Sequence, residues 1–157
     1  MFEVDFDEFV ADLEKDWARV VAEIRTGVVR GVGYGARAGA EAIRAGHTFK
    51  NQSGDLERGI VHAVIGWTTE NTYQAKIVSQ ATYSSFVEKG TAPHQIAGRR
   101  NGALTFEWKG ELVHFRYVMH PGTKPMPFMH LGFEAAEKVI RRELEAALTR
   151  ADAILSR

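Results

Sequence analysis

The best candidates for acid–base chemistry in this chain are Glu88 and His94, a carboxylate and an imidazole that stand close together in the sequence. General acid–base catalysis needs a second positioned group beside the first. Glu88 has no obvious partner of this kind, so we interpret it as a structural carboxylate that is paired with another group or accepts backbone N–H groups from the turn at Gly90 and Thr91. The alternative is a small hydrolase or ligand-binding domain, in which Glu88 and His94 would share a pocket.

Other kinds of catalytic and cofactor site have less support in the sequence. The chain has six histidines and no cysteine, and it lacks both the H-x-x-x-H pair and the H-E-x-x-H motif of metal-binding helices. Ser84 and Ser85 are outside any G-x-S-x-G nucleophile motif. Gly33–Ala38 fits the G-x-G-x-x-A dinucleotide fingerprint, but a helical pattern precedes it where the fingerprint needs a strand. We therefore predict no catalytic residue, no metal and no cofactor.

The composition narrows the function classes further. The chain has 157 residues, of which 45% are apolar and 25% charged, as in an ordinary globular domain. Lys and Arg balance Asp and Glu at 20 each, which argues against a dedicated nucleic-acid-binding protein and favours self-association. No apolar run approaches the ~18 residues of a membrane span, and the acidic segment Met1–Glu8 is unlike a signal peptide. We expect a protein that is made and kept in a cytoplasm, or in something assembled there.

A long helix is predicted for the N-terminal region, residues 1–46. Apolar residues recur there at three- and four-residue spacing, which places them on one core-facing stripe. This stripe consists of Phe6, Phe9, Val10, Leu13, Trp17, Val20, Val21, Ile24 and Val28. Asp5 or Asp7 can cap the start of the helix, and Gly46 supplies its C-terminal stop.

Four glycines follow one another at intervals of four residues within this helical pattern: Gly27, Gly31, Gly35 and Gly39. In a helix they would share one face, where a second backbone could approach closely. Each glycine costs a helix about 1 kcal/mol relative to alanine, so a packing or hinge role is one interpretation. The other is a frayed or broken helix, and the sequence leaves both open.

Two β-hairpins are predicted between residues 53 and 128. In the first, a three-residue loop at Thr69–Asn71 sets Trp67 opposite Tyr73, with Asn71 in the left-handed conformation that closes the turn. The same register predicts the pairs Ile65–Ala75 and Ala63–Ile77. Just before this hairpin, Ser53 is a candidate cap for a short turn.

The second hairpin turns at Lys109–Gly110, which puts Phe106 opposite Val113 and Leu104 opposite Phe115. Its apolar face consists of Leu104, Phe106, Trp108, Val113, Phe115 and Tyr117. Its polar face consists of Thr105, Glu107, His114 and Arg116. Such one-sided alternation is typical of an antiparallel sheet with one solvated face.

The last predicted element is a helix over residues 127–157, with Pro127 in its first turn, where a missing N–H has no cost. Its apolar stripe consists of Met129, Phe133, Ala136, Ile140, Leu144, Ala147, Leu148, Ala151, Ile154 and Leu155. We therefore predict one α+β domain, residues 1–157. In it, the two hairpins of residues 53–128 form a four-stranded antiparallel sheet that packs with the long N- and C-terminal helices.

Residues 89–102 are predicted as a long loop that is rich in glycine and carries His94, Arg99 and Arg100. Loops of this length without their own structure are commonly functional or disordered. The two arginines could contact DNA phosphate or an acidic neighbour, or the loop could be a solvated tip. A further hypothesis is a nucleic-acid-binding module, which would use Arg99, Arg100, Trp108 and Phe106.

Two sequence blocks surround this region. Tyr83–Thr91 reads Y-x-x-F-V-E-x-G-T, and Pro121–Phe128 reads P-G-x-x-P-x-P-F directly before the last helix. Ser53–Ile60 looks like a third block, T-G-x-L-x-x-x-I, with serine in place of threonine. Together these blocks resemble the lambda-like tail-completion proteins, a family of the siphophage head–tail junction. The motif residues are Tyr83, Phe86, Glu88, Gly90, Thr91, Pro127 and Phe128.

The resemblance implies a structural virion protein without enzymatic activity. Such a protein would form a hexameric ring of identical subunits, stacked on the tail tube and next to the stopper and tail-terminator proteins of the neck. It would be assembled in the host cytoplasm and would contact DNA in the channel only passively. Sheet edges and residues 89–102 would engage neighbouring subunits. A tail-terminator or stopper ring of the same neck is the alternative within this class.

Overall fold

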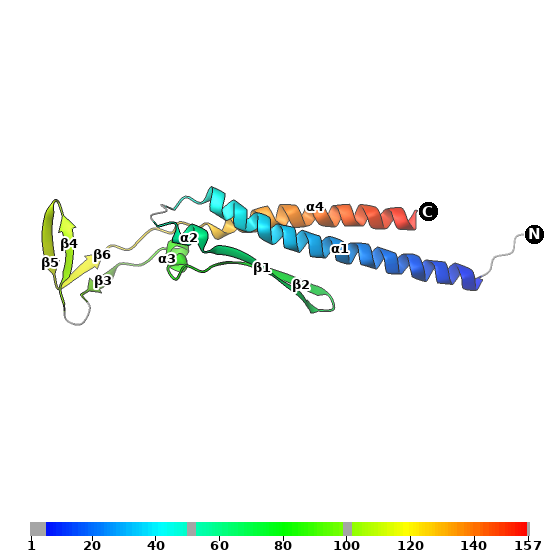
Figure 1. Cartoon of the computed structure of the whole chain (residues 1–157), viewed down its shortest axis with the longest axis horizontal. Coiled ribbons are helices and arrows are strands. Elements are labelled where there is room, and N and C mark those ends of the chain that lie inside the picture. Colours follow the sequence, from blue (N-terminus) through cyan, green and yellow to red (C-terminus); the bar gives the residue numbers. More distant parts are fainter. Residues whose placement is uncertain (1–5, 50–52, 99–101, 157) are drawn as a thin grey trace, which may run out of the picture. The chain divides into compact units, whose positions relative to one another are not determined.

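The computed structural model describes residues 6–49, 53–98 and 102–156 (Figure 1). The helices are α1 (Phe6–Gly46), α2 (Asp55–Arg58), α3 (Ser84–Lys89) and α4 (Met129–Leu155). The strands are β1 (Ile60–Thr69), β2 (Thr72–Ser79), β3 (His94–Ala97), β4 (Leu104–Trp108), β5 (Glu111–Phe115) and β6 (Tyr117–His120). The chain divides into two compact units, which we call unit 1 (residues 1–81 and 128–157) and unit 2 (residues 82–127). The predicted α+β class, with long N- and C-terminal helices, is confirmed.

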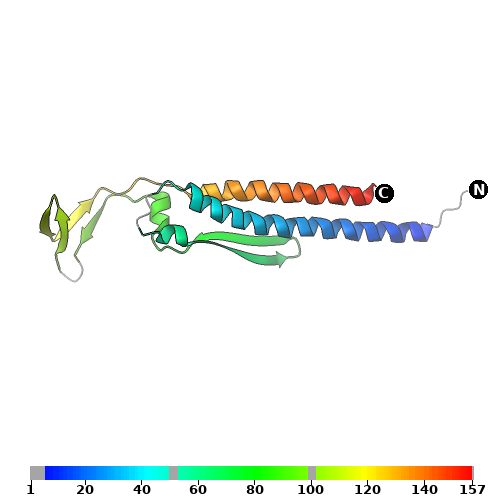
Figure 2. The same ribbon diagram turned by 45° about the horizontal axis from the view of Figure 1, so that its top comes forward.

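Unit 1 is built on α1 and α4, which lie side by side (Figures 1 and 2). They are antiparallel, because Gly39 of α1 meets Gly132 near the start of α4, while Gly27 meets Ala147 near its end. The end of α4 is also joined to α1 by an ion pair, in which Nε of Arg150 lies 2.8 Å from Oε2 of Glu23.

The four evenly spaced glycines of α1 form the face that contacts α4. A Cβ atom on Gly35 would lie 2.9 Å from Cγ1 of Ile140 and 3.1 Å from the carbonyl oxygen of Ala136, and one on Gly31 would lie 3.3 Å from Cα of Ile140. These distances are too short for side chains in a close-packed interior, so the helices approach this closely only because the glycines have none. α1 is unbroken along its described length, so the packing interpretation is confirmed and the broken helix is wrong.

The first turns of α1 continue beyond the end of α4 (Figure 2). Val20 is buried within unit 1, whereas Leu13 is 52% exposed and Trp17 is 63% exposed. The predicted core-facing stripe is therefore wrong for these turns. The physical reason for the exposure is length. α1 has 41 residues and α4 has 27, so the apolar stripe of α1 extends past the part of the helix that α4 can cover.

The β1–β2 hairpin lies along α1 in both views (Figures 1 and 2). Trp67 faces Tyr73 as predicted, with ring centroids 5.1 Å apart. The turn is shorter than predicted, because Thr69 pairs with Thr72. The left-handed conformation predicted for Asn71 is wrong, since the only positive φ of a non-glycine residue in the described part of the chain belongs to another turn.

The register of β1 against β2 also differs from the prediction. Irregularities lie between Val64 and Gly66 and between Trp67 and Thr69, and Gly66 has a φ of 99°. Such a bulge inserts an extra residue into one strand and displaces every pair beyond it. Val64 therefore faces Ala75. The predicted pairs that this makes wrong are Ile65–Ala75 and Ala63–Ile77.

Arg25 of α1 holds the tip of this hairpin. Its guanidinium carbon lies 4.3 Å from the centre of the Trp67 ring, and the same group donates a 3.1 Å hydrogen bond to the carbonyl oxygen of Glu70. We expect Arg25→Met to lower the free energy of unfolding by about 1 kcal/mol, because it removes a cation–π contact and a hydrogen bond at an exposed position. Urea unfolding measures this change, with Arg30→Met on the same helix as the control. Equal losses in the two variants would contradict the role of Arg25.

The strands form three separate two-stranded antiparallel ladders, β1–β2, β3–β6 and β4–β5, so the predicted four-stranded sheet is wrong. β1–β2 belongs to unit 1, where α1 packs on it, and the other two ladders belong to unit 2. A helix can cover the apolar face of a hairpin as a second hairpin would. In β4–β5 the predicted register is confirmed: Phe106 faces Val113 and Leu104 faces Phe115, across a turn whose φ values are 53° at Lys109 and 87° at Gly110.

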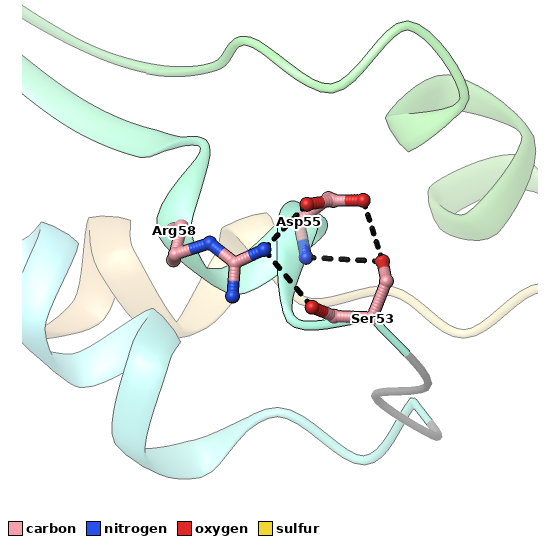
Figure 3. A network of polar contacts seen from close by, with 3 residues as sticks. All are labelled: Ser53, Asp55 and Arg58. Atoms are coloured by element: carbon pink, nitrogen blue, oxygen red, sulfur yellow. Dashed lines mark hydrogen bonds and ion pairs between the residues drawn. The ribbon is translucent and has the colours of Figure 1, made fainter.

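A polar network shapes the turn that begins α2 (Figure 3). The Ser53 hydroxyl donates to Oδ2 of Asp55 at 2.6 Å and accepts the backbone N–H of Asp55 at 3.3 Å. The N-cap itself is Gly54, so the predicted capping role of Ser53 is wrong and the serine instead precedes the cap. Arg58 donates to the Ser53 carbonyl oxygen at 2.9 Å and pairs with Oδ1 of Asp55. The hydrogen bond from Ser53, and next the one from Arg58, hold the pKa of Asp55 below its ordinary value.

The lowered pKa of Asp55 predicts how this turn responds to acid. Because the pKa is lower in the folded chain, the carboxylate contributes stability above the ordinary aspartate pKa, and the contribution is lost as the pH falls through the folded value. NMR titration of the Asp55 carboxyl carbon should give a midpoint below that of an unfolded aspartate. Ser53→Ala should raise the pKa more than Arg58→Met, because the serine bond is the larger cause. A wild-type midpoint at the ordinary value would contradict the network.

The start of α4 is set by an aromatic contact. Phe128 stands at the N-cap, so Pro127 precedes the helix and its predicted place in the first turn is wrong. Phe128 is 1% exposed and meets Phe49 edge to face, with ring centroids 5.3 Å apart. Phe49 in turn stacks on His47 at 3.8 Å. With a φ of −133° and a ψ of −21°, Phe128 is outside the helical conformation, while its ring is buried in the core of unit 1.

Candidate binding groove

The two main motif blocks of the sequence are bonded to each other in unit 2. Thr91 and Thr123 stand 32 residues apart. The N–H of Thr91 donates to the carbonyl oxygen of Thr123 at 3.0 Å, and the reverse bond is 3.1 Å. The N–H of Met126 also donates to the carbonyl oxygen of Val87 at 2.9 Å. We call this bonded pair of segments, residues 83–91 and 121–126, the motif junction.

Two glycines permit this close approach. Gly90 has a φ of 70° and a ψ of −177°, and a Cβ there would lie 2.8 Å from the backbone nitrogen of Pro125 and overlap the carbonyl oxygen of Thr123. Gly122 has a φ of 85°, and its Cβ would overlap the carbonyl oxygen of Thr91. Both positions combine a backbone conformation that favours glycine with a neighbour that excludes a side chain.

An open, mostly apolar groove of about 780 Å³ lies on the motif junction. It is lined by Tyr83, Phe86, Val87, Gly90, Thr91, Ala92, Pro93, His94, His120, Thr123 and Met126. This volume is within the range of known small-molecule sites, roughly 300–1,000 Å³. The groove therefore gathers several of the motif residues on one accessible surface.

Helix α3 supplies one side of the groove. Gly90 is its C-cap, with a φ of 70°. Tyr83 is 41% exposed and Phe86 is 58% exposed, so neither side chain is buried in a core of unit 2. An exposed aromatic pair on a short helix is available to another molecule.

Strand β3 lies inside the predicted loop 89–102, so that part of the prediction is wrong. It pairs with β6, with His94 opposite His120. β3 has only four residues, and its partner follows after the whole β4–β5 hairpin. The sequence therefore has neither a connecting turn nor a long alternating pattern that would indicate this pair of strands.

His94 and His120 form the polar end of the groove. Their ring centroids are 5.1 Å apart. Nδ1 of His94 lies 3.0 Å from the carbonyl oxygen of Ala92, while Nδ1 of His120 accepts the N–H of Gly122 at 3.1 Å. In neutral His120 the proton is therefore on Nε2. Within the described residues, no three His, Cys, Asp or Glu side chains gather as metal ligands would.

The remaining predicted site residues lie elsewhere. Glu88 is half-buried on α3 and is outside the set of residues that lines this groove, whereas His94 belongs to that set. The N–H of Thr91, one of its predicted partners, donates to Thr123. Phe128 belongs to the core of unit 1. Arg99 and Arg100 lie outside the residues that the structure describes.

A repeated dipeptide in the sequence indicates this junction, but it was not among the features from which the site was predicted. Gly90–Thr91 and Gly122–Thr123 are the same dipeptide, and the structure pairs them directly. Thr123, Met126 and His120 were absent from the predicted site for this reason. A repeated Gly–Thr pair can be recognised only when both copies are considered as one bonded unit.

Unit 2 also exposes large apolar side chains outside the groove, on both faces of β4–β5 and on β6. They are Trp108, Leu112, Phe115, Tyr117 and Met119, each of which is at least 47% exposed. The predicted polar face of the same hairpin is present, since Thr105 Oγ1 lies 2.9 Å from His114 Nδ1. Exposed apolar surface of this extent is typical of proteins that bind other proteins.

Comparisons of the chain with models of protein families, with curated proteins and with solved structures gave no match. None of the helices in the described ranges is long and apolar enough to span a membrane.

Proposed function

We propose that this chain is a structural subunit of the siphophage head–tail junction, of the tail-completion type, which acts by binding and turns over no substrate. It assembles as a hexameric ring with the tail tube, the stopper and the tail terminator as its neighbours. Its place is the virion neck, and residues 89–102, with Arg99 and Arg100, meet a neighbour or the DNA in the channel.

The observation that carries this proposal is the motif junction. The sequence blocks on which the family resemblance depends are far apart in the chain, and yet Thr91 and Thr123 bond them into one unit. Their side chains border an open apolar groove. A surface of this kind is suited to holding part of another protein.

Charge and surface composition support the same conclusion. The formal net charge is zero, so copies do not repel one another at long range. Trp17, Phe86, Trp108 and Phe133 are each more than half exposed. Large exposed apolar side chains in several places fit a subunit that is covered only in its assembly.

The test is deletion of the gene from the phage or prophage that carries it. We expect filled heads and finished tails that fail to join, with joining restored by the gene supplied in trans. Native mass spectrometry of the protein, alone and with tail tubes, should give the mass of a hexameric ring. Fully joined, infectious particles from the deletion would contradict the proposal. A tail terminator would give a different result. The protein would be bound to free tails, and deletion of its gene would give overlong tail tubes.

A further inference from the structure

We propose that the first turns of α1 in one copy dock in the groove of a second copy. The contact would join α1 residues 6–18, which we call the N-terminal arm, to the groove on the motif junction of the next subunit. This inference rests on the proposed function, because it names the partner that the groove takes during ring assembly.

The N-terminal arm carries an apolar stripe that its own unit leaves open. Val10, Leu13 and Trp17 recur at the spacing of one helix face, and Trp17 is 63% exposed. A helix that lays such a stripe into a groove is an established mode of protein recognition, with anchors at these intervals.

The groove offers the complementary surface. Its walls include Tyr83, Phe86, Val87, Pro93 and Met126, which are aromatic or flexible apolar side chains. Exposed tyrosine and phenylalanine beside a methionine can adapt to an inserted tryptophan. The groove is also open to solvent, and its volume of about 780 Å³ leaves room for large side chains.

Charge distinguishes this pairing from other apolar contacts. The N-terminal arm has five acidic residues and one basic residue, whereas unit 2 has six Lys or Arg residues and three Glu. Lys89 and Lys124 stand directly beside residues that line the groove, and both are exposed. An acidic arm and the two lysines beside the apolar groove attract each other, and two acidic arms repel. A second copy of this chain therefore satisfies both surfaces.

A contact between two different surfaces is of the kind that builds rings. The arm and the groove are different surfaces, so each copy presents one to the neighbour before it and one to the neighbour after it. Contacts of this heterologous kind close into rings when the rotation between subunits fits.

The first test measures self-association of the full chain by sedimentation. We expect the arm variant Leu13→Ala/Trp17→Ala and the groove variant Phe86→Glu each to raise the dissociation constant at least tenfold. All three positions are exposed, so circular dichroism should show an unchanged fold. Leu148→Ala, also an exposed apolar residue on a long helix, is the matched control and should bind as wild type. Higher salt should weaken the wild-type contact, because the attraction is screened. Wild-type affinity in both the arm and the groove variant would overturn the proposal.

Mixing separates this contact from its rivals. The arm variant keeps its groove and Phe86→Glu keeps its arm, so a mixture should form one-to-one heterodimers at concentrations where neither variant alone self-associates. If two arms paired with each other instead, Phe86→Glu would still self-associate and the mixture would gain nothing. An arm that docked in the groove of its own chain would leave the wild type monomeric at every concentration, and that result overturns the proposal as well.

Disulfide trapping extends the test to weak association. The chain has no cysteine, so Ala18→Cys beside Trp17 and Ser85→Cys beside Phe86 give single thiols on exposed positions. A mixture of the two should form the mixed disulfide faster than either homodimer, and excess homodimer from Ala18→Cys would contradict the proposal. The two proposals can fail separately. If heads and tails need the gene for joining but the arm variants still form rings, this contact is wrong and the proposed function stands.

Discussion

We expect Gly39→Ala to lower the free energy of unfolding by about 2–3 kcal/mol, the cost of forcing extra volume into a packed interface. A Cβ on Gly39 would lie 2.5 Å from the carbonyl oxygen of Gly132 and 2.5 Å from Cδ1 of Ile77. The side chain of Ile77 can move aside, but the backbone of α4 can do so only if the two helices separate. Thermal or guanidinium unfolding followed by circular dichroism measures the loss.

Gly33→Ala on the same helix is the matched control, and it should have the opposite sign. The nearest atom to a Cβ there is Cγ2 of Val64 at 3.9 Å, an ordinary contact. Alanine is favoured over glycine within a helix by roughly 0.5–1 kcal/mol, so this variant should be more stable than wild type. If both variants were stabilised, α1 and α4 could not pack in the observed way.

Gly90→Ala should open the motif junction, with a local cost of about 3 kcal/mol from backbone strain and overlap together. A φ of 70° with a ψ of −177° is a conformation that side chains exclude, and the added Cβ would also meet Thr123 and Pro125. We expect the amide protons of Thr91 and Thr123 to exchange at least tenfold faster with deuterium. Assembly of the Gly90→Ala protein into particles should also fail.

Gly110→Ala provides the comparison for that experiment. Its φ is 87°, but a Cβ there would meet nothing within 4 Å, so only the strain of about 1 kcal/mol remains. Amide exchange at Thr91 should be unchanged in this variant. Protection that survived in Gly90→Ala would show that the bonds between the two blocks do not depend on this glycine.

The sequence predicted best where neighbours along the chain determine the geometry. The turn at Lys109–Gly110 and the facing pair Phe106–Val113 were correct, because the turn residues and the alternation agree over a few positions. The first hairpin shows the limit of the same reasoning. Its bulge at Gly66 inserts one residue, and a pattern with a period of two cannot indicate where that happens.

The candidate site was predicted in part. Tyr83, Phe86, Gly90, Thr91 and His94 do border one groove. Phe128 proved to be a core residue of unit 1, and Glu88 is outside the groove lining. Residues that meet across the motif junction could not be recognised from either block alone, because each block supplies only half of the hydrogen bonds.

By itself the sequence determined the two long helices, the turn at Lys109–Gly110 and the motif blocks, since dihedral preferences and apolar periods act between residues close in the chain. The tertiary structure alone decided which surfaces meet. It set the glycines of α1 against α4, left Trp17 exposed, and covered β1–β2 with a helix in place of a second hairpin. The physical reason is that burying apolar surface is favourable against any element of suitable shape. Only the folded chain shows which element lies close enough to cover that surface.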